Sequence, residues 1–164
     1  MKILVVSDTH RDFNALKSII DANADADMLI HLGDGESEFD DVERLYPQFP
    51  MVYVCGNCDY GTHKLSHIVT ACGIRIFCCH GHTYHVRDGI EYLVSAARQN
   101  DCAIALYGHT HLFRAEQTGG VFVMNPGSPS SPRGGNKPTY GIITLGGQGD
   151  IKMDMISMED HKAI

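Results

Sequence analysis

The sequence predicts an α/β protein with two facing mixed β-sheets and helices on their outer sides, in one domain over residues 1–164. Two observations lead to this prediction. The first half of the chain alternates short apolar runs with helical patterns, which is typical of parallel strands joined by helices. The second half holds successive strands separated by Gly, Pro and Asn, with no helical pattern between them. Two such sets of strands bury their apolar faces when the sheets face each other and the helices lie outside.

The first half of the chain is predicted to contain three strands and two helices. Strands are expected at three short apolar runs bounded by polar residues or Gly: 2–7, 27–32 and 51–55. Apolar residues recur at helical spacing over 13–20, directly after Asp12, which can cap a helix N-terminus. A more polar helix is predicted over about 37–46, because Pro47 cannot continue it.

The middle of the chain is predicted to form two paired strands, a helix and a further strand. The paired strands are expected over 65–70 and 74–79. Asp88 and Glu91 have the spacing of a capping box and predict the start of a helix between them. The apolar run 102–107 is predicted to be another buried strand.

The chain after His111 changes character. Four strands with antiparallel connections are expected there, over 112–118, 120–124, 139–145 and 151–156. The segment 125–138 is rich in Ser, Pro and Gly and is predicted to be a long loop. The second half is therefore expected to be a β-meander.

Composition restricts the function. The formal net charge of −7 disfavours long nucleic acids as ligands, because binding to them depends on Lys and Arg neutralising phosphates. The sequence has no apolar run near the roughly 20 residues that span a bilayer and no signal-peptide pattern. We therefore expect no membrane segment and a cytoplasmic location.

Six cysteines are present, and we expect them to be reduced. Cys55, Cys72, Cys78, Cys79 and Cys102 lie in or beside apolar runs, where thiols pack as small hydrophobes. Cys55 and Cys58 form a single C-x-x-C, without the second pair that a structural zinc site needs. A redox role for this pair stays open as the weaker alternative.

Seven polar side chains follow the C-terminal ends of predicted strands. They are Asp8, His10, Asp34, Asn57, His80, His109 and His111. Ligands bind at this edge of open α/β sheets, so these residues are expected to form one site. Two carboxylates, an amide oxygen and four imidazoles suit Mn²⁺, Fe²⁺, Zn²⁺, Co²⁺ or Ni²⁺ better than Ca²⁺ or Mg²⁺. A pair of such ions can generate a hydroxide nucleophile and stabilise a phosphoryl displacement, with Asp34 as the natural bridging ligand.

These motifs resemble the calcineurin-like metallophosphoesterase superfamily. The matching segments are Asp8-Thr9-His10, Gly33-Asp34, Gly56-Asn57-Cys58-Asp59, His80-Gly81-His82 and Gly108-His109-Thr110-His111. The short chain and the segment Asn125-Pro126-Gly127-Ser128 are similar to the small YfcE-type phosphodiesterases within it. The resemblance runs from residue 3 to about residue 145. Five motifs in this order are far more specific than any one of them.

The resemblance implies a four-layer αββα sandwich and two divalent transition-metal ions, most readily Mn²⁺. One ion would be held by Asp8, His10, Asp34 and His111, and the other by Asp34, Asn57, His80 and His109. It also implies that a metal-held hydroxide attacks the phosphate diester. His10, Asn57 and His111 would then act in catalysis, and Asp59 would orient a metal ligand.

The sequence departs from the wider superfamily at Cys58, where many members carry a His that assists the leaving group. A neutral thiol is a poor acid, so we expect slow turnover of poor leaving groups and better turnover of aryl esters. Arg11, Cys58, His82 and Arg133 are candidates for contact with the substrate, with ordinary surface positions as the alternative. We expect Asn125 and Ser128 to shape the loop beneath the metals, and His31 to have a structural role behind the site.

Two functions are compatible with this resemblance. The first is a metal-dependent phosphodiesterase acting on a small phosphodiester. The second is a non-enzymatic scaffold, since the retromer complex contains a protein with this fold. The complete set of seven ligands favours the enzyme. Assembly into a homo-oligomer, the physiological substrate and the native metal are left open by the sequence.

Overall fold

The computed structural model describes residues 1–164 except the side chain of Gln148. It contains two five-stranded sheets. The first has the order β10 (Ile151–Ser157), β9 (Thr139–Leu145), β1 (Lys2–Val6), β2 (Met28–His31) and β3 (Met51–Tyr53). The second has the order β4 (Ser66–Ala71), β5 (Ile74–Cys79), β6 (Ile104–Leu106), β8 (Val121–Asn125) and β7 (Arg114–Thr118).

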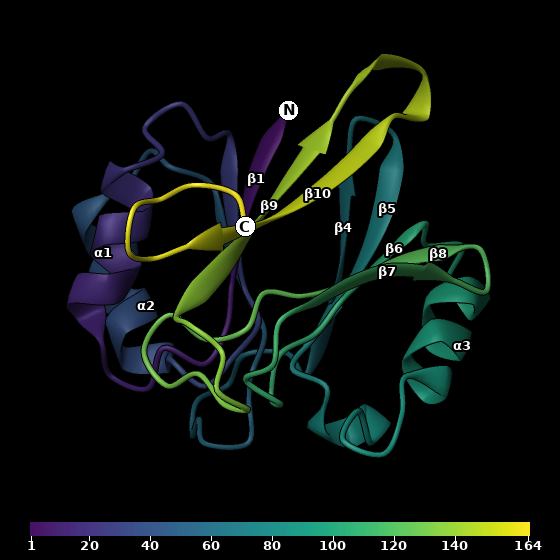
Figure 1. The fold of residues 1–164 in the computed structure, drawn as a ribbon, viewed down its shortest axis with the longest axis horizontal. Helices are drawn as coiled ribbons and strands as arrows, with labels where there is room; N and C mark the ends of the chain where they lie inside the picture. The colour runs from purple at the N-terminus through teal and green to yellow at the C-terminus, as the bar shows by residue number, and fades with distance from the viewer.

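Three α-helices cover the outer faces of the sheets, which confirms the predicted sandwich. Helices α1 (Phe13–Asp21) and α2 (Glu36–Leu45) lie outside the first sheet, and α3 (Glu91–Gln99) lies outside the second (Figure 1). Short 3₁₀ turns, η1 (His82–Tyr84) and η2 (Gly147–Gly149), occur in two of the connections. In the described part of the chain, no helix has the length and apolar character needed to cross a membrane.

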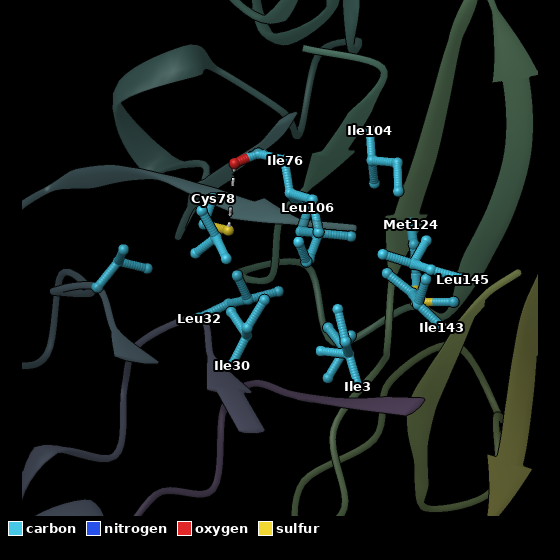
Figure 2. Close-up of a cluster of buried hydrophobic side chains, with 14 of the residues drawn as sticks. Ile3, Ile30, Leu32, Ile76, Cys78, Ile104, Leu106, Met124, Ile143 and Leu145 are labelled. Atoms are coloured by element: carbon cyan, nitrogen blue, oxygen red, sulfur yellow. Dashed lines mark hydrogen bonds between the residues drawn. The ribbon is translucent and has the colours of Figure 1, made fainter. Parts of the chain in front are cut away.

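Apolar side chains alternate between the two faces of the inner strands, and this explains how the layers pack. In β1, Ile3 and Val5 belong to the core between the sheets, whereas Leu4 and Val6 pack toward α1 and α2. Figure 2 shows Ile3 and Ile30 of the first sheet facing side chains of the second, including Leu106. Because successive side chains point to opposite faces, an inner strand such as β1 contributes to two cores at once.

Both sheets contain two neighbouring parallel pairs. Strand β1 pairs parallel with β2, and β2 with β3. In the second sheet, β5 pairs parallel with β6, and β6 with β8. The C-terminal ends of parallel neighbours lie at one edge of a sheet, so the segments that follow these strands come together.

The predicted helix starts are partly confirmed. Asp12 caps α1, since its side chain accepts a hydrogen bond from the backbone N–H of Ala15 at 2.9 Å. The predicted capping box of α3 is wrong. The N-cap is Ile90, without a side-chain cap, and Glu91 is the first helical residue. Asp88 is two residues too early because the chain turns there, with its N–H bonded to the carbonyl of His85.

The predicted β-meander is also wrong. Strands β7 and β8 form an antiparallel hairpin in the second sheet, and β9 and β10 form one in the first. The loop over 126–138 crosses between the sheets, so β8 and β9 never pair. A meander needs short connections, and this loop instead passes the site described below.

All six cysteines are free thiols. Four are buried as predicted, at positions 55, 78, 79 and 102. Cys72 is exposed, because it lies in the tight turn between β4 and β5 at a φ of 49°. Its expected packing is therefore wrong.

Candidate metal centre

The loops that carry the candidate ligands are tied to one another by backbone hydrogen bonds. Asp8 N–H donates to the carbonyl of Gly33, and His10 N–H donates to that of Asp34, both at 3.0 Å. Gly108 N–H donates to the carbonyl of His80 at 2.9 Å. These bonds fix the β1 loop to the β2 loop, and the β5 loop to the β6 loop.

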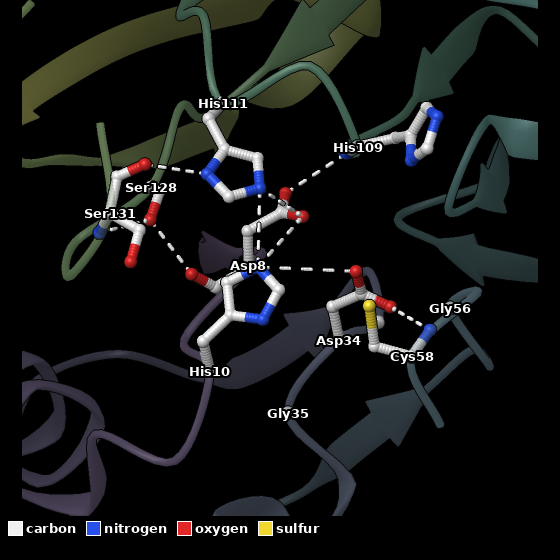
Figure 3. Close-up of polar contacts among 12 residues, drawn as sticks. Asp8, His10, Asp34, Gly35, Gly56, Cys58, His109, His111, Ser128 and Ser131 are labelled. Atoms are coloured by element: carbon white, nitrogen blue, oxygen red, sulfur yellow. Dashed lines mark hydrogen bonds and ion pairs between the residues drawn. The ribbon is translucent and has the colours of Figure 1, made fainter. Parts of the chain in front are cut away.

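Two buried carboxylates form the middle of the site, and three imidazoles lie against them. His111 Nε2 lies 3.2 Å from Asp8 Oδ1, and His80 Nε2 lies 3.5 Å from Asp34 Oδ2. His10 Nε2 lies 3.2 Å from His111 Nε2 and 3.9 Å from Asp8 Oδ1. In Figure 3 the rings of His10 and His111 approach the Asp8 carboxylate from two sides.

These side chains form overlapping groups whose donor atoms lie within 4.8 Å of one another. The groups are Asp8 with His10 and His111, Asp8 with Asp34 and His80, and His10 with Asp34 and Cys58. Three residues each belong to two groups: Asp8, His10 and Asp34. Such sharing is what two neighbouring cations require.

The chemistry of these atoms fits a bound cation. Asp8 Oδ1 and His80 Nε2 are fully buried and have no hydrogen-bond partner among the described residues. A buried carboxylate oxygen or imidazole nitrogen without a partner is costly. Coordination to a divalent ion would satisfy both atoms, and their mixed oxygen and nitrogen character suits a transition metal.

Charge in the site shifts several pKa values. Burial raises the pKa of the Asp8 carboxyl, but the adjacent His111 and His80 imidazoles outweigh burial and lower it overall. For Asp34 the pKa is also lowered, because His80 outweighs the effect of burial. Burial lowers the pKa of His80 and of His111, yet the carboxylates outweigh it and raise both. The site therefore stabilises positive charge next to its two carboxylates.

The backbone of the site is strained. Six of its residues have a left-handed φ between 43° and 72°: Asp8, His10, Arg11, Asp34, His109 and His111. Left-handed residues other than Gly are uncommon, and such strain clusters at functional sites. The conformation lets closely spaced ligands such as His109 and His111 leave the chain in different directions.

Asp59 joins the loops that follow β2 and β3. Its carboxylate accepts backbone hydrogen bonds from Asp34 at 2.9 Å and Gly56 at 2.7 Å, and one from the Tyr53 hydroxyl at 2.7 Å. These bonds hold the backbone of Asp34, so Asp59 acts on that residue through its main chain.

A buried polar network behind the site was not predicted in full. Glu38, 3% exposed, accepts hydrogen bonds from Thr9 Oγ1 at 2.5 Å and from the backbone N–H of Arg11 at 2.7 Å. His31 Nδ1 accepts from Gly33 N–H at 3.2 Å, so its Nε2 carries the proton and donates to Thr9 Oγ1 at 3.0 Å. The burial of Glu38 was hard to predict from the sequence, because this residue lies in a polar helix where a carboxylate is usually exposed.

Neutral His31 is expected to make stability depend on pH. Burial lowers its pKa from 6.5 to about 4, and protonation would abolish the bond from Gly33. The unfolded chain binds this proton first, so stability is full above pH 6.5 and falls as the pH decreases toward 4. The loss is up to about 3 kcal/mol by linkage.

Urea unfolding between pH 4 and 7 measures this effect. Other groups titrate in the same range, so the His31→Gln variant is the reference. Its free energy of unfolding should fall less steeply with decreasing pH than that of the wild type. Equal slopes would contradict a neutral His31 in the fold.

The end of β8 and the loop after it support the site from one side. Ser128 Oγ donates to the carbonyl of Asp8 at 2.7 Å, and Asn125 Nδ2 donates to that of Gly108 at 2.8 Å. His111 Nδ1 donates to the carbonyl of Ser131 at 2.5 Å. These residues hold the backbone and the ring orientation of the candidate ligands.

Two predicted ligands are placed differently: His109 lies outside these groups of His, Cys, Asp and Glu side chains, and Asn57 lies beside Cys58, a member of one group. Asn57 is exposed, and its amide nitrogen contacts Cys58 Sγ at 3.3 Å. The His109 ring packs against His80 with centroids 5.1 Å apart, while its backbone N–H donates to Asp8 Oδ2 at 2.9 Å. In Figure 3 this ring points away from the two carboxylates. Their assignment as ligands stays a prediction.

The candidate substrate contacts are distributed unevenly. Arg11 and Cys58 line a cavity of about 450 Å³ together with His10 and Asp34. His82 lies against His80 with ring centroids 5.5 Å apart. The exposed Arg133 donates its backbone N–H to the carbonyl of His111 at 3.2 Å. Only the first two therefore border the cavity beside the carboxylates, among the described side chains.

Comparison with known proteins places the chain in a family. A model of the calcineurin-like phosphoesterase superfamily domain matches residues 1–148. The chain belongs to this superfamily. The phosphodiesterase YfcE of Escherichia coli K12 is 34% identical over 188 aligned positions, which cover 100% of this chain and 96% of YfcE. The predicted family and its YfcE-type resemblance are thus confirmed, and they support hydrolase activity.

Solved structures with the same fold include a predicted phosphoesterase and a vacuolar protein sorting protein. A conserved protein of Streptococcus pneumoniae TIGR4, described as a predicted phosphoesterase, superposes with a TM-score of 0.86 at 28% identity. The match covers 99% of this chain and 92% of that one. Vacuolar protein sorting 29 of Cryptosporidium parvum has a TM-score of 0.81 at 18% identity, with 99% and 94% coverage. That identity indicates a shared fold alone.

Proposed function

We propose that this protein is a divalent-metal-dependent phosphodiesterase with a two-metal centre. The observation that carries the proposal is the pair of buried carboxylates, Asp8 and Asp34, with three imidazole nitrogens within 4.0 Å of them. The 34% identity to a phosphodiesterase supports the reaction class. Mn²⁺ is the most suitable ion, and Zn²⁺, Fe²⁺, Co²⁺ and Ni²⁺ also match these ligands.

The protein itself sets which imidazole atoms face the carboxylates. His80 Nδ1 donates to the carbonyl of Leu32 at 2.7 Å, and His111 Nδ1 donates to that of Ser131 at 2.5 Å. Each bond keeps the ring proton on Nδ1, so that Nε2 is available to a cation. When bound, a metal pair would supply a nucleophile from water and offset charge on the phosphoryl oxygens. His10, Asn57 and His111 would lie beside the reacting phosphate.

Cys58 limits the protonation of the leaving group in this proposal. Partial desolvation raises the pKa of its thiol to about 11, and the Asp34 carboxylate adds to the effect. A thiol with this pKa gives up its proton poorly near neutral pH. Activated aryl diesters need no such acid, whereas alkyl leaving groups do.

Turnover should therefore fall as the pKa of the leaving group rises. The measurement is kcat/KM for a series of aryl phosphodiesters with Mn²⁺, in the wild type and in Cys58→His. The variant should gain most on the poorest leaving groups, by about 10-fold or more, since a positioned acid contributes roughly 10²–10⁴-fold. A flat dependence, with chemistry shown to be rate-limiting, would contradict this role.

A panel of small diesters and monoesters tests the function itself. The protein is assayed after chelation and after reloading with Mn²⁺. Metal-stimulated hydrolysis of diesters would support the enzyme. No hydrolysis in any reloaded sample would favour the scaffold, for which the likeness to Vps29 at 18% identity provides only the fold.

The acidic chain favours small substrates over long nucleic acids. A net charge of −7 repels polyanions outside the metal site. We also propose a cytoplasmic location and assembly into homo-oligomers. Size-exclusion chromatography with light scattering determines the oligomeric state.

A further inference from the structure

Cys58 adds a sulfur atom to the site. Its Sγ, a nitrogen of His10 and a carboxylate oxygen of Asp34 all lie within 4.8 Å of one another. The backbone N–H of Cys58 donates to Asp34 Oδ1 at 2.8 Å, which holds the thiol beside that carboxylate. Figure 3 shows the sulfur next to the Asp34 carboxylate, on the side of the site opposite His111 and Ser131.

This group differs chemically from the other two. The groups around Asp8 contain only oxygen and nitrogen donors. A thiolate is a soft ligand and favours Zn²⁺ and similar cations over hard ones. One imidazole, one carboxylate and one thiolate leave the fourth position of a tetrahedral zinc site open to water.

We propose that His10, Asp34 and Cys58 form a binding site for a thiophilic divalent cation, such as Zn²⁺ or Cd²⁺. This cation site shares His10 and Asp34 with the proposed hydrolytic centre, and the inference rests on the proposed function in this respect alone. The exposure of Cys58 and the adjoining cavity of about 450 Å³ give a cation access from solvent.

Binding requires that the thiol loses its proton. The S–H bond breaks, the proton passes to the buffer, and the sulfur electron pair forms the bond to the cation, with no change of oxidation state. The nearby carboxylates oppose a thiolate in the protein alone, and a dication reverses that effect.

A thiophilic cation in this site would compete with hydrolysis. It takes His10 and Asp34 away from the arrangement that Mn²⁺ needs. Cd²⁺ should therefore inhibit Mn²⁺-supported turnover, and Cys58→Ser should weaken this inhibition by about 10-fold or more, as expected for the loss of a soft ligand.

Ultraviolet absorption tests the site without an activity assay. The reduced, chelator-treated full chain is titrated with Cd²⁺, and thiolate-to-cadmium charge transfer is recorded together with bound cadmium. The wild type should develop the band of one thiolate. Cys58→Ser should lose it. Cys72→Ser is the matched control, because Cys72 is the other exposed thiol and lies in the turn before β5, at the opposite end of that strand from His80.

The outcomes separate the two proposals. An unchanged band in Cys58→Ser, or bound cadmium without a band in the wild type, would overturn the cation site. A wild-type band that needs Cys72 would overturn it as well. Failure to hydrolyse any diester would overturn the proposed function and leave the band unaffected.

Discussion

The Asp34→Asn variant is expected to lose at least about 100-fold in metal-stimulated kcat/KM, because even the partners of metal ligands typically contribute 10- to 100-fold. Asp34 Oδ2 lies 3.5 Å from His80 Nε2 and 4.0 Å from His10 Nε2. An amide of the same shape keeps one oxygen for the N–H of Cys58 but removes the negative charge that both proposed ions share. Metal content and diester hydrolysis, measured on the same sample, check this expectation.

Asp41→Asn is the matched control. It lies on α2 near Asp34 in sequence, but its side chain is exposed and pairs with Arg44. The control should bind metal and hydrolyse diesters like the wild type. Full activity in Asp34→Asn, with unchanged metal content, would show that the proposed centre is wrong.

The fold could be predicted because local pattern and burial agree. Apolar runs such as 2–7 and 27–32 became central parallel strands, and the spacing over 13–20 became α1. The pairing of strands that are distant in the sequence was harder to predict. The pattern of β7 to β10 fits a meander or two separate hairpins equally well, since alternation along a strand does not identify its neighbour.

The position of the site could also be predicted, since ligands gather where parallel strands end. Its internal geometry could not. The left-handed backbone at Asp8 and His10 is fixed by contacts such as Arg11 N–H to Glu38, which join residues 27 positions apart. Glu38 itself has a polar helical context that gives no sign of burial.

The carboxylates are shared between the groups of candidate ligands in a different way from the one predicted from the sequence. Asp34 was expected to bridge, and the geometry gives Asp8 a comparable place, between His10, His111 and His80. Cys58 joins a third group where only substrate contact was expected. Side-chain direction at strongly turned loops decides these differences, and sequence spacing alone does not contain it.

Gly33→Ala is expected to destabilise the fold by about 3 kcal/mol, with about 1–2 from the left-handed backbone and the rest from overpacking. Gly33 has a φ of +97°, and an added Cβ would lie 2.6 Å from Gly56 N and 2.9 Å from Val54 O. These are backbone atoms of the segment after β3, so relief requires that the ends of β2 and β3 separate. Asp8 N–H bonds to the carbonyl of Gly33, so the proposed metal centre should loosen too.

The Gly73→Ala variant separates the cost of the left-handed backbone from the cost of overpacking. Gly73 has a φ of +76° and would place its Cβ in open space, so this variant contains only the backbone cost of about 1 kcal/mol. Urea unfolding of both variants, at equal m-value, measures the difference. A Gly33→Ala loss no larger than that of Gly73→Ala would mean that the close approach of Gly33 to Gly56 does not constrain the site. The larger loss, together with weaker Mn²⁺ binding, would tie the packing of these two strand ends to the position of Asp34.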